Sequence, residues 1–180
     1  MKERWIEKDL KSFQLQPNLT DYQKEYEAFT TAKSYAAELF ILGGGSNMLL
    51  TGDIHKTVLH VALKGKEIIS ETEEEVIIEA QAGENWHEFV TWCIANDLGG
   101  LENLSLIPGQ VGTSPMQNIG AYGVEIKDVF HELEAMEIES GRIVKFSAED
   151  CRFGYRESVF KNELKALNKS FTEINGDQTH

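Results

Sequence analysis

Two short windows of the 180-residue sequence hold nine of its 15 glycines, and they are the first candidates for chemistry. The first window, ILGGGSN at 41–47, is an apolar run that leads into three consecutive glycines. Consecutive glycines let several backbone N–H groups point into one concavity, which suits a phosphate oxygen. No Gly-Lys-Ser/Thr follows, as a Walker A loop requires, and Met48 stands where a dinucleotide fingerprint has its third glycine. The window predicts either an anion-binding loop of another kind or an ordinary tight turn.

The second window, 99–123, is too rich in Gly, Pro and small polar residues to be a simple connector. Structureless segments of more than ~15 residues inside a compact domain are usually functional or disordered. Apolar residues recur throughout the window and argue against disorder; they are Leu104, Leu106, Ile107, Val111, Met116 and Ile119. We therefore expect an ordered loop that presents backbone N–H groups to a polyanionic ligand.

Arg156 is the third candidate, because it follows Tyr155 in the segment CRFGYRES at 151–158. A guanidinium can hold a carboxylate through two parallel hydrogen bonds. The alternative is an ion pair with Glu157 or with another acid on the surface, and the residues alone leave both open. The five histidines show neither HxxxH nor HExxH spacing, so we expect no metal site.

The charge balance limits the partners of these candidates. With 30 acidic and 17 basic side chains the formal net charge is −13, which repels nucleic-acid backbones and anionic lipid surfaces. No apolar run approaches the ~20 residues of a membrane helix, and the charged segment at 1–13 does not fit a secretory signal. We expect a cytoplasmic protein in which Cys93 and Cys151 are reduced core residues.

Helices that would position the windows follow from the hydrophobic period. Capping-box spacing and steps near 3.6 residues predict a helix over 20–39. Asn85 and Glu88 predict the start of a second helix, which we expect to end at Gly99-Gly100. Its expected buried stripe is Trp86, Phe89, Val90, Cys93 and Ile94.

Strands are predicted at 39–42, 57–63 and 76–80 by short runs of apolar and β-branched residues. The acidic run ETEEE at 71–75 reads as a solvated turn between strands. Alternation over 129–138 and a Ser-Gly turn before 143–146 predict a β-hairpin. Interspersed helices and strands with an antiparallel pair indicate an α+β fold.

Taken together, these features resemble the UDP-N-acetylmuramate dehydrogenases, also called UDP-N-acetylenolpyruvoylglucosamine reductases. The matching stretches are ILGGGSN at 41–47, AGENWHEFV at 82–90, GLENLSLIPGQVGTSPMQNIGAYG at 100–123 and CRFGYRESVFK at 151–161. The resemblance implies a FAD-binding PCMH-type fold, tightly bound FAD and NADPH as co-substrate. It implies the reduction of UDP-N-acetylglucosamine enolpyruvate in peptidoglycan precursor synthesis, with the flavin carrying the hydride and the protein supplying position and charge.

The resemblance also implies roles for individual residues. Arg156 would be catalytic, holding the substrate carboxylate and stabilising the enolate-like charge. Tyr122 and Tyr155 would lie on the substrate side, with a packing role as the alternative for Tyr122. The cofactor site would comprise Gly43, Gly44, Gly45, Ser46, Asn47, Pro108, Gly109, Gly112, Thr113, Ser114, Asn118, Gly120 and Gly123.

Some family segments have no match in this sequence. The family opens with an Asn-Thr-Phe-Gly strand and carries a proton-donating serine and a glutamate downstream of its Tyr-Arg pair. We therefore expect a divergent first lobe over 1–40, the FAD-binding domain over 41–161 and a polar tail over 162–180. The expectation is a truncated member that lacks the substrate-binding C-terminal domain and has impaired turnover. A flavin-binding module without turnover and a remnant unable to hold FAD are the alternatives.

Overall fold

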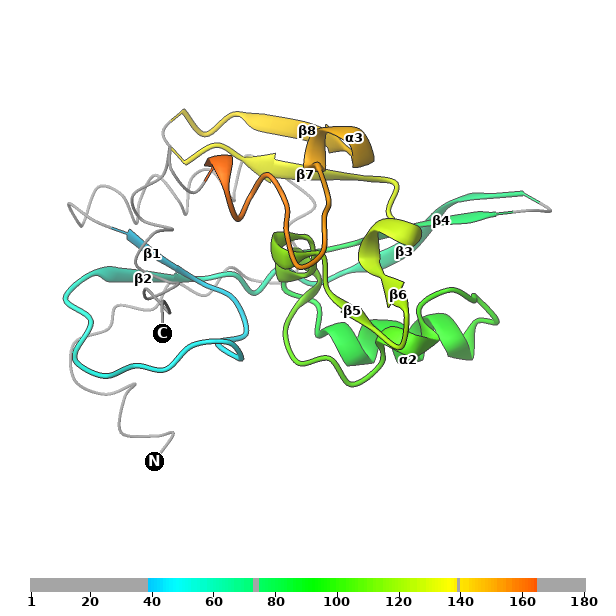
Figure 1. Ribbon diagram of the computed structural model, residues 1–180, viewed down its shortest axis with the longest axis horizontal. Coiled ribbons are helices and arrows are strands. Elements are labelled where there is room, and N and C mark those ends of the chain that lie inside the picture. Colours follow the sequence, from blue (N-terminus) through cyan, green and yellow to red (C-terminus); the bar gives the residue numbers. More distant parts are fainter. Residues whose placement is uncertain (1–38, 73–74, 139, 165–180) are drawn as a thin grey trace.

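The computed structural model describes residues 39–72, 75–138 and 140–164. These residues form four two-stranded sheets, short 3₁₀ helices and two α-helices, which agrees with the α+β prediction. Figure 1 shows one strand pair at one end of the molecule and a long hairpin projecting at the other. No helix in the described ranges has the length and apolar composition needed to span a bilayer. The helix expected over 20–39 and most of the expected tail lie outside the described residues.

The three glycines of the first window directly follow a short strand. β1 (Leu39–Leu42) pairs in parallel with β2 (Thr57–His60). Leu59 of β2 is buried against Ile41, Met136 and Ile138. The N–H of Val61 donates to the carbonyl of Leu42 at 2.9 Å, which continues the pairing to the end of β1. β2 is three residues shorter than expected. The parallel pair thus fixes the point from which the glycine loop leaves.

The acidic run joins two antiparallel strands, as predicted. β3 (Lys66–Glu71) pairs with β4 (Val76–Ala80), and the N–H of Thr72 donates to the carbonyl of Glu75 at 2.9 Å. This is the projecting hairpin of Figure 1. A second hairpin, β7 (Glu132–Met136) with β8 (Ile143–Ser147), confirms the other antiparallel prediction and leads into α3 (Ala148–Cys151).

The long helix α2 (Trp86–Ala95) starts as predicted and ends earlier. The Asn85 side chain accepts from the N–H of Glu88 at 3.0 Å, which caps the first turn. The end expected at Gly99-Gly100 is wrong, because the backbone N–H and side-chain amide of Asn96 both donate to the carbonyl of Trp92 and close the last turn. Ile94, expected to be buried, is 48% exposed, while the other four stripe residues are buried.

The second glycine window is ordered and packs on α2. It contains η2 (Glu102–Leu104), η3 (Val111–Gln117) and β5 (Gly120–Ala121), and β5 pairs with β6 (Val124–Glu125) before η4 (Ile126–Asp128). The main core joins the two segments through Trp86, Phe89, Val90, Cys93, Leu101, Leu104, Ile119 and Ile126. The hydrophobic anchors therefore hold the polar part of the window in place.

Both cysteines are free and buried, as expected. Burial raises the pKa of each thiol, Cys93 and Cys151, to about 11. At neutral pH both are therefore protonated and behave as small apolar side chains.

Candidate functional site

The two glycine windows meet at one pocket. A Cβ placed on Gly44 would lie 3.6 Å from the Gly109 Cα, so the loop after β1 faces the Pro108–Gln110 segment directly. A cavity of about 390 Å³ opens between them. We call it the glycine pocket; it is lined by Gly44, Ser46, Lys64, Gly83, Asn85, Pro108, Gly109 and Gln110.

Backbone donors in the glycine pocket are free to bind an anion. Within the described residues, the N–H groups of Gly43 to Asn47 have no hydrogen-bond partner. Gly45 has a φ of +66°, a left-handed conformation that turns the chain and that glycine adopts without strain. The ammonium group of Lys64 adds a positive charge to the lining. Of this loop, Gly44 and Ser46 line the pocket. Unengaged N–H groups that point into one concavity favour phosphate oxygens.

Gln110 carries an acceptor that lacks a partner. Its Nε2 donates to the carbonyl of Val61 at 3.3 Å, but its Oε1 is buried without a hydrogen bond among the described residues. Leaving a buried acceptor unsatisfied costs ~1–3 kcal/mol. Because Gln110 lines the glycine pocket, a ligand with hydroxyl groups fits this atom. The residues present therefore fit a cofactor that carries both a pyrophosphate and sugar-type hydroxyls.

Other predicted cofactor residues shape the second window from within. The N–H of Gly112 donates to the carbonyl of Ala82 at 2.9 Å, and the N–H of Thr113 donates to the carbonyl of Gln110 at 3.1 Å. The buried Ser114 hydroxyl donates to the carbonyl of Val111 at 2.7 Å. Contrary to expectation, the amides of Gly112 and Thr113 are therefore not free to hold an anion.

Asn118 connects the second window to the Tyr-Arg segment. Its side chain is completely buried; Nδ2 donates to the carbonyl of Gly154 at 2.9 Å, and Oδ1 accepts from the N–H of Lys127 at 3.1 Å. Both ends of the amide are engaged, so the side chain ties these segments together. The cofactor role predicted for Asn118 stays a prediction. Gly120 lies in β5 and Gly123, with a φ of +82°, completes the following turn.

Arg156 reaches this turn, which carries Tyr122, and Tyr155 precedes Arg156 in the chain. Arg156 Nη2 donates to the carbonyl of Gly120 at 2.9 Å, which brings the guanidinium to the turn that carries Tyr122. Tyr122 is 88% exposed and Tyr155 is 84% exposed, so neither side chain is used for packing. We call Tyr122, Tyr155 and Arg156 the Tyr-Arg cluster. None of the three lines the glycine pocket.

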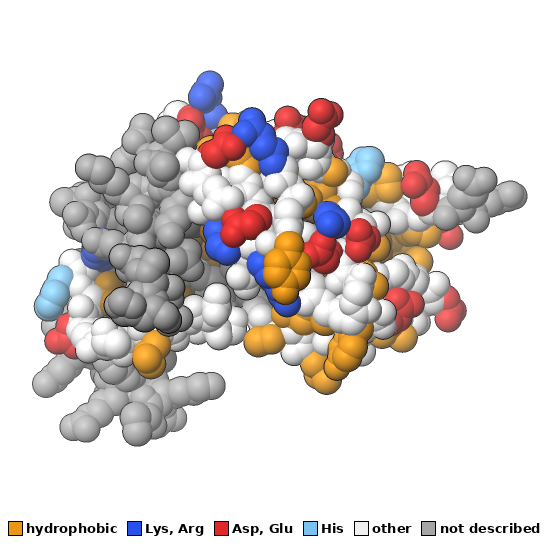
Figure 2. Space-filling view, viewed as in Figure 1, with side chains coloured by type: hydrophobic (Ala, Val, Ile, Leu, Met, Phe, Trp, Pro, Cys, Tyr) orange, Lys and Arg blue, Asp and Glu red, His pale blue; other side chains and the backbone are white. Residues whose placement is uncertain are grey.

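Arg156 has no ion-pair partner among the described residues. The expected competitor, Glu157, instead pairs with Lys161 at 3.1 Å and accepts from the Asn162 amide at 2.6 Å, contacts that lower the pKa of Glu157 below its ordinary value. Figure 2 shows basic side chains interspersed with acidic ones on the face where residues 152–161 run. The guanidinium therefore retains a charge that an anionic group can bind.

Glu84 is a buried support that the sequence did not reveal. It accepts from the N–H of Gly65 at 2.8 Å and from Lys66 Nζ at 3.3 Å, with Lys64 Nζ at 3.9 Å. Burial opposes its ionisation, but these contacts outweigh burial and hold the pKa of Glu84 below its ordinary value. The Lys-Gly-Lys sequence at 64–66 was the available signal, although only the fold brings it to Glu84.

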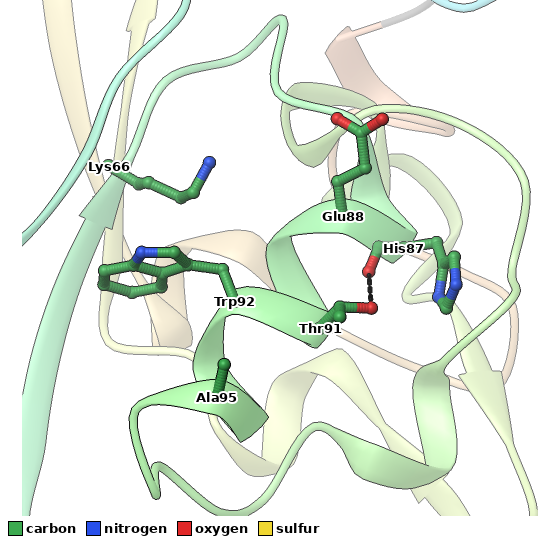
Figure 3. A pocket seen from close by; sticks show the side chains of 6 residues that line it. All are labelled: Lys66, His87, Glu88, Thr91, Trp92 and Ala95. Carbon is green, nitrogen blue, oxygen red and sulfur yellow. Dashed lines mark hydrogen bonds between the residues drawn. The ribbon is translucent and has the colours of Figure 1, made fainter.

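A larger hollow of about 490 Å³ lies on the outer face of α2 and contains none of the predicted residues (Figure 3). Lys66 Nζ lies 6.0 Å from the centre of the Trp92 ring, and Figure 3 shows this pair on one side of the hollow. The His87 ring points away from both, toward the opposite side. The Lys66–Trp92 pair and the His87 ring therefore lie on opposite sides of this hollow.

Comparison with known proteins places these features in a family. The FAD binding domain model matches residues 20–147. The reductase named UDP-N-acetylenolpyruvoylglucosamine reductase from Flavobacterium johnsoniae is 63% identical over 126 residues, which cover 70% of this chain and 37% of that protein. The protein of the same name from Pseudomonas aeruginosa is 52% identical over 137 residues, which cover 76% of this chain and 40% of that protein.

A solved structure supports the same fold. The UDP-N-acetylenolpyruvylglucosamine reductase from Thermus caldophilus matches with a TM-score of 0.59 and 23% identity, over 83% of this chain and 58% of that one. The chain spans about two-fifths of the length of the curated relatives it matches. The resemblance seen in the sequence is thus confirmed, and the chain belongs to the FAD binding domain family, with UDP-N-acetylenolpyruvoylglucosamine reductases as its relatives.

Proposed function

We propose that this chain binds FAD in the glycine pocket and serves an NADPH-dependent reductase of UDP-N-acetylglucosamine enolpyruvate. One observation carries the proposal. The loop 43–47, with unengaged N–H groups, faces Gly109 and Gln110 across a polar cavity of about 390 Å³. A protein with a net charge of −13 can still bind a pyrophosphate if neutral backbone donors hold it.

The chain's own groups would hold the cofactor as follows. The N–H groups of Gly44 to Asn47 bind the pyrophosphate oxygens, and Lys64 offsets part of their charge. Gln110 Oε1 accepts from a hydroxyl of the bound group and so gains the partner that it lacks. Bound FAD supplies hydride chemistry that no side chain can provide.

Arg156 is proposed as the catalytic residue for the substrate. Its guanidinium bonds the Gly120 carbonyl and has no carboxylate partner among the described residues. It can therefore take the carboxylate of an enolpyruvyl group and stabilise the negative charge that develops beside it after hydride addition. The exposed rings of Tyr122 and Tyr155 would flank the substrate.

A flavin-binding module without turnover is the second candidate. The observation that favours it concerns Ser158, the serine two residues after Arg156. The hydroxyl of Ser158 is buried and donates to the carbonyl of Met116 at 2.6 Å, so this serine is not placed to protonate a substrate. Loss of a positioned general acid typically costs ~10²–10⁴-fold in rate.

The test separates the candidates with the 180-residue polypeptide. Flavin absorbance after FAD loading reports the cofactor, and NADPH oxidation with and without UDP-N-acetylglucosamine enolpyruvate reports turnover. Substrate-dependent oxidation that falls at least ~10²-fold in Arg156→Ala supports the reductase. FAD binding with no substrate-dependent oxidation supports the module, and absence of FAD binding contradicts both.

A further inference from the structure

His87 lies on the first turn of α2 and contacts the loop that leads into the glycine pocket. Figure 3 shows its ring turned away from Trp92 and Lys66, and Thr91 bonded to the His87 backbone carbonyl instead. On the loop side, His87 Nδ1 lies 3.0 Å from the Ser105 hydroxyl and 3.3 Å from the backbone nitrogen of Leu106. The role of His87 in the site is inferred on the basis of the proposed FAD binding.

The two contacts fix the tautomer of His87. A backbone N–H can only donate, so Nδ1 must be the acceptor for Leu106 and carries no proton. The ring proton then lies on Nε2, and the Ser105 hydroxyl donates to the same Nδ1. His87 is therefore a side-chain acceptor for two consecutive residues of the loop.

Leu106 is a residue that needs such a contact. Its φ is +63°, a left-handed conformation that a leucine adopts only at a cost, and its side chain is 76% exposed. Packing of the side chain thus does not compensate for the strained backbone. The hydrogen bond that the Leu106 N–H donates to His87 Nδ1 offsets part of this cost.

The same loop is tied to the start of α2 on both sides of Leu106. Trp86 Nε1 donates to the carbonyl of Leu104 at 2.7 Å, and the N–H of Trp86 donates to the carbonyl of Gly109 at 3.1 Å. Between these two ties, His87 holds the chain at Leu106. Pro108 and Gly109, which line the glycine pocket, follow directly.

We propose that His87 is a positioning residue for FAD: by accepting from Leu106 through Nδ1, it holds the left-handed turn that places Pro108 and Gly109 at the pocket. His87 does not line the glycine pocket, so it would act through the loop. Asparagine carries an acceptor oxygen in nearly the position of Nδ1, whereas alanine carries none. The proposal therefore requires that one substitution preserve FAD affinity and the other reduce it.

The experiment is an FAD titration, followed by flavin fluorescence, of the 180-residue polypeptide and of His87→Ala, His87→Asn and Thr91→Ala. We expect His87→Ala to raise the Kd for FAD about tenfold, which corresponds to ~1.4 kcal/mol. His87→Asn should recover most of the affinity. Thr91→Ala removes a hydroxyl on the same helix face without touching Nδ1 and should change the Kd less than twofold.

A second readout does not depend on FAD. The ¹⁵N shifts of the His87 ring in the unsubstituted protein should show the Nε2–H tautomer, and the Leu106 amide should exchange with solvent at least ~10-fold faster in His87→Ala. A proton on Nδ1, unchanged Leu106 exchange, or equal FAD affinity of the alanine and asparagine variants would overturn the proposal. If the unsubstituted protein binds no FAD, the proposed function fails, and the NMR results still decide whether His87 holds Leu106.

Discussion

The glycine pocket is lined in part by a loop whose backbone N–H groups no described residue engages, whereas in the Tyr-Arg cluster the polar groups are side chains. The pocket uses N–H groups of 43–47 that no described residue engages. The cluster uses a guanidinium and two exposed rings, and both Tyr122 and Arg156 are left-handed, with φ of +53° and +54°. The two regions therefore differ in what a substitution can remove. A side-chain replacement cannot delete the backbone N–H groups of the loop, whereas it can delete the guanidinium or a ring of the cluster.

Removing the link between the two regions should have the largest effect on stability. Asn118→Ala deletes two part-buried hydrogen bonds of a completely buried side chain, one to Gly154 and one from Lys127. We expect a loss of ~2–4 kcal/mol in the free energy of unfolding. Urea denaturation measures it, with the exposed Asn103→Ala as the control. A loss as small as that of the control would show that the two regions are not coupled through Asn118.

The charge under the pocket should make stability depend on pH. Because the pKa of Glu84 is depressed below 4.5, its ionised form stabilises the fold above pH 4.5, and this contribution is lost as pH falls through the lower, folded-state pKa. We expect Glu84→Gln to cost ~1 kcal/mol at pH 7 and progressively less below pH 4.5. Denaturation of both proteins between pH 7 and pH 3 gives the difference, and a difference that grows on acidification would contradict this assignment.

We expect the smallest change in the free energy of unfolding when the strained backbone of the Tyr-Arg cluster is relieved at Tyr122. Tyr122→Gly removes an exposed ring from a left-handed position, so we expect the free energy of unfolding to stay constant or rise by up to ~1 kcal/mol. Tyr122→Phe keeps the strain and should leave stability unchanged. If Tyr122→Gly destabilised the protein by more than ~1 kcal/mol, the ring would have a packing role and the comparison drawn above would fail.

Much of the fold could be predicted because its signals are local. The cap at Asn85, the β-branched strands and the acidic turn each depend on neighbours in the sequence. The end of α2 could not be placed, because Asn96 closes the helix before the glycines that usually mark such an end. Glycine density pointed to the loop that lines the pocket for the same local reason, although the sequence left an ordinary tight turn open for it.

The remaining site residues depend on tertiary contacts that the sequence does not display. Gln110 reaches Val61, 49 positions away, while its Oε1 is buried without a partner among the described residues. Lys64 lines the pocket because Glu84 holds the neighbouring backbone. Within the described ranges Arg156 has no ion-pair partner, and Lys161 and Asn162 engage the neighbouring Glu157, which a count of nearby acids cannot show.

FAD affinity of Gly44→Val tests the central claim most directly. Gly44 lines the pocket and does not have a left-handed φ, so valine fits the backbone while its methyl groups enter the space beside Gly109. Gly45→Val is less informative, because its φ of +66° would strain any side chain. Gly52→Val is the matched control, since no atom lies within 4 Å of a Cβ at Gly52. We predict that Gly44→Val raises the Kd for FAD at least ~10²-fold, equivalent to ~2.7 kcal/mol, with an unchanged unfolding midpoint. Equal FAD affinity in the Gly44 and Gly52 variants would contradict the claim that the pyrophosphate binds between the two glycine windows.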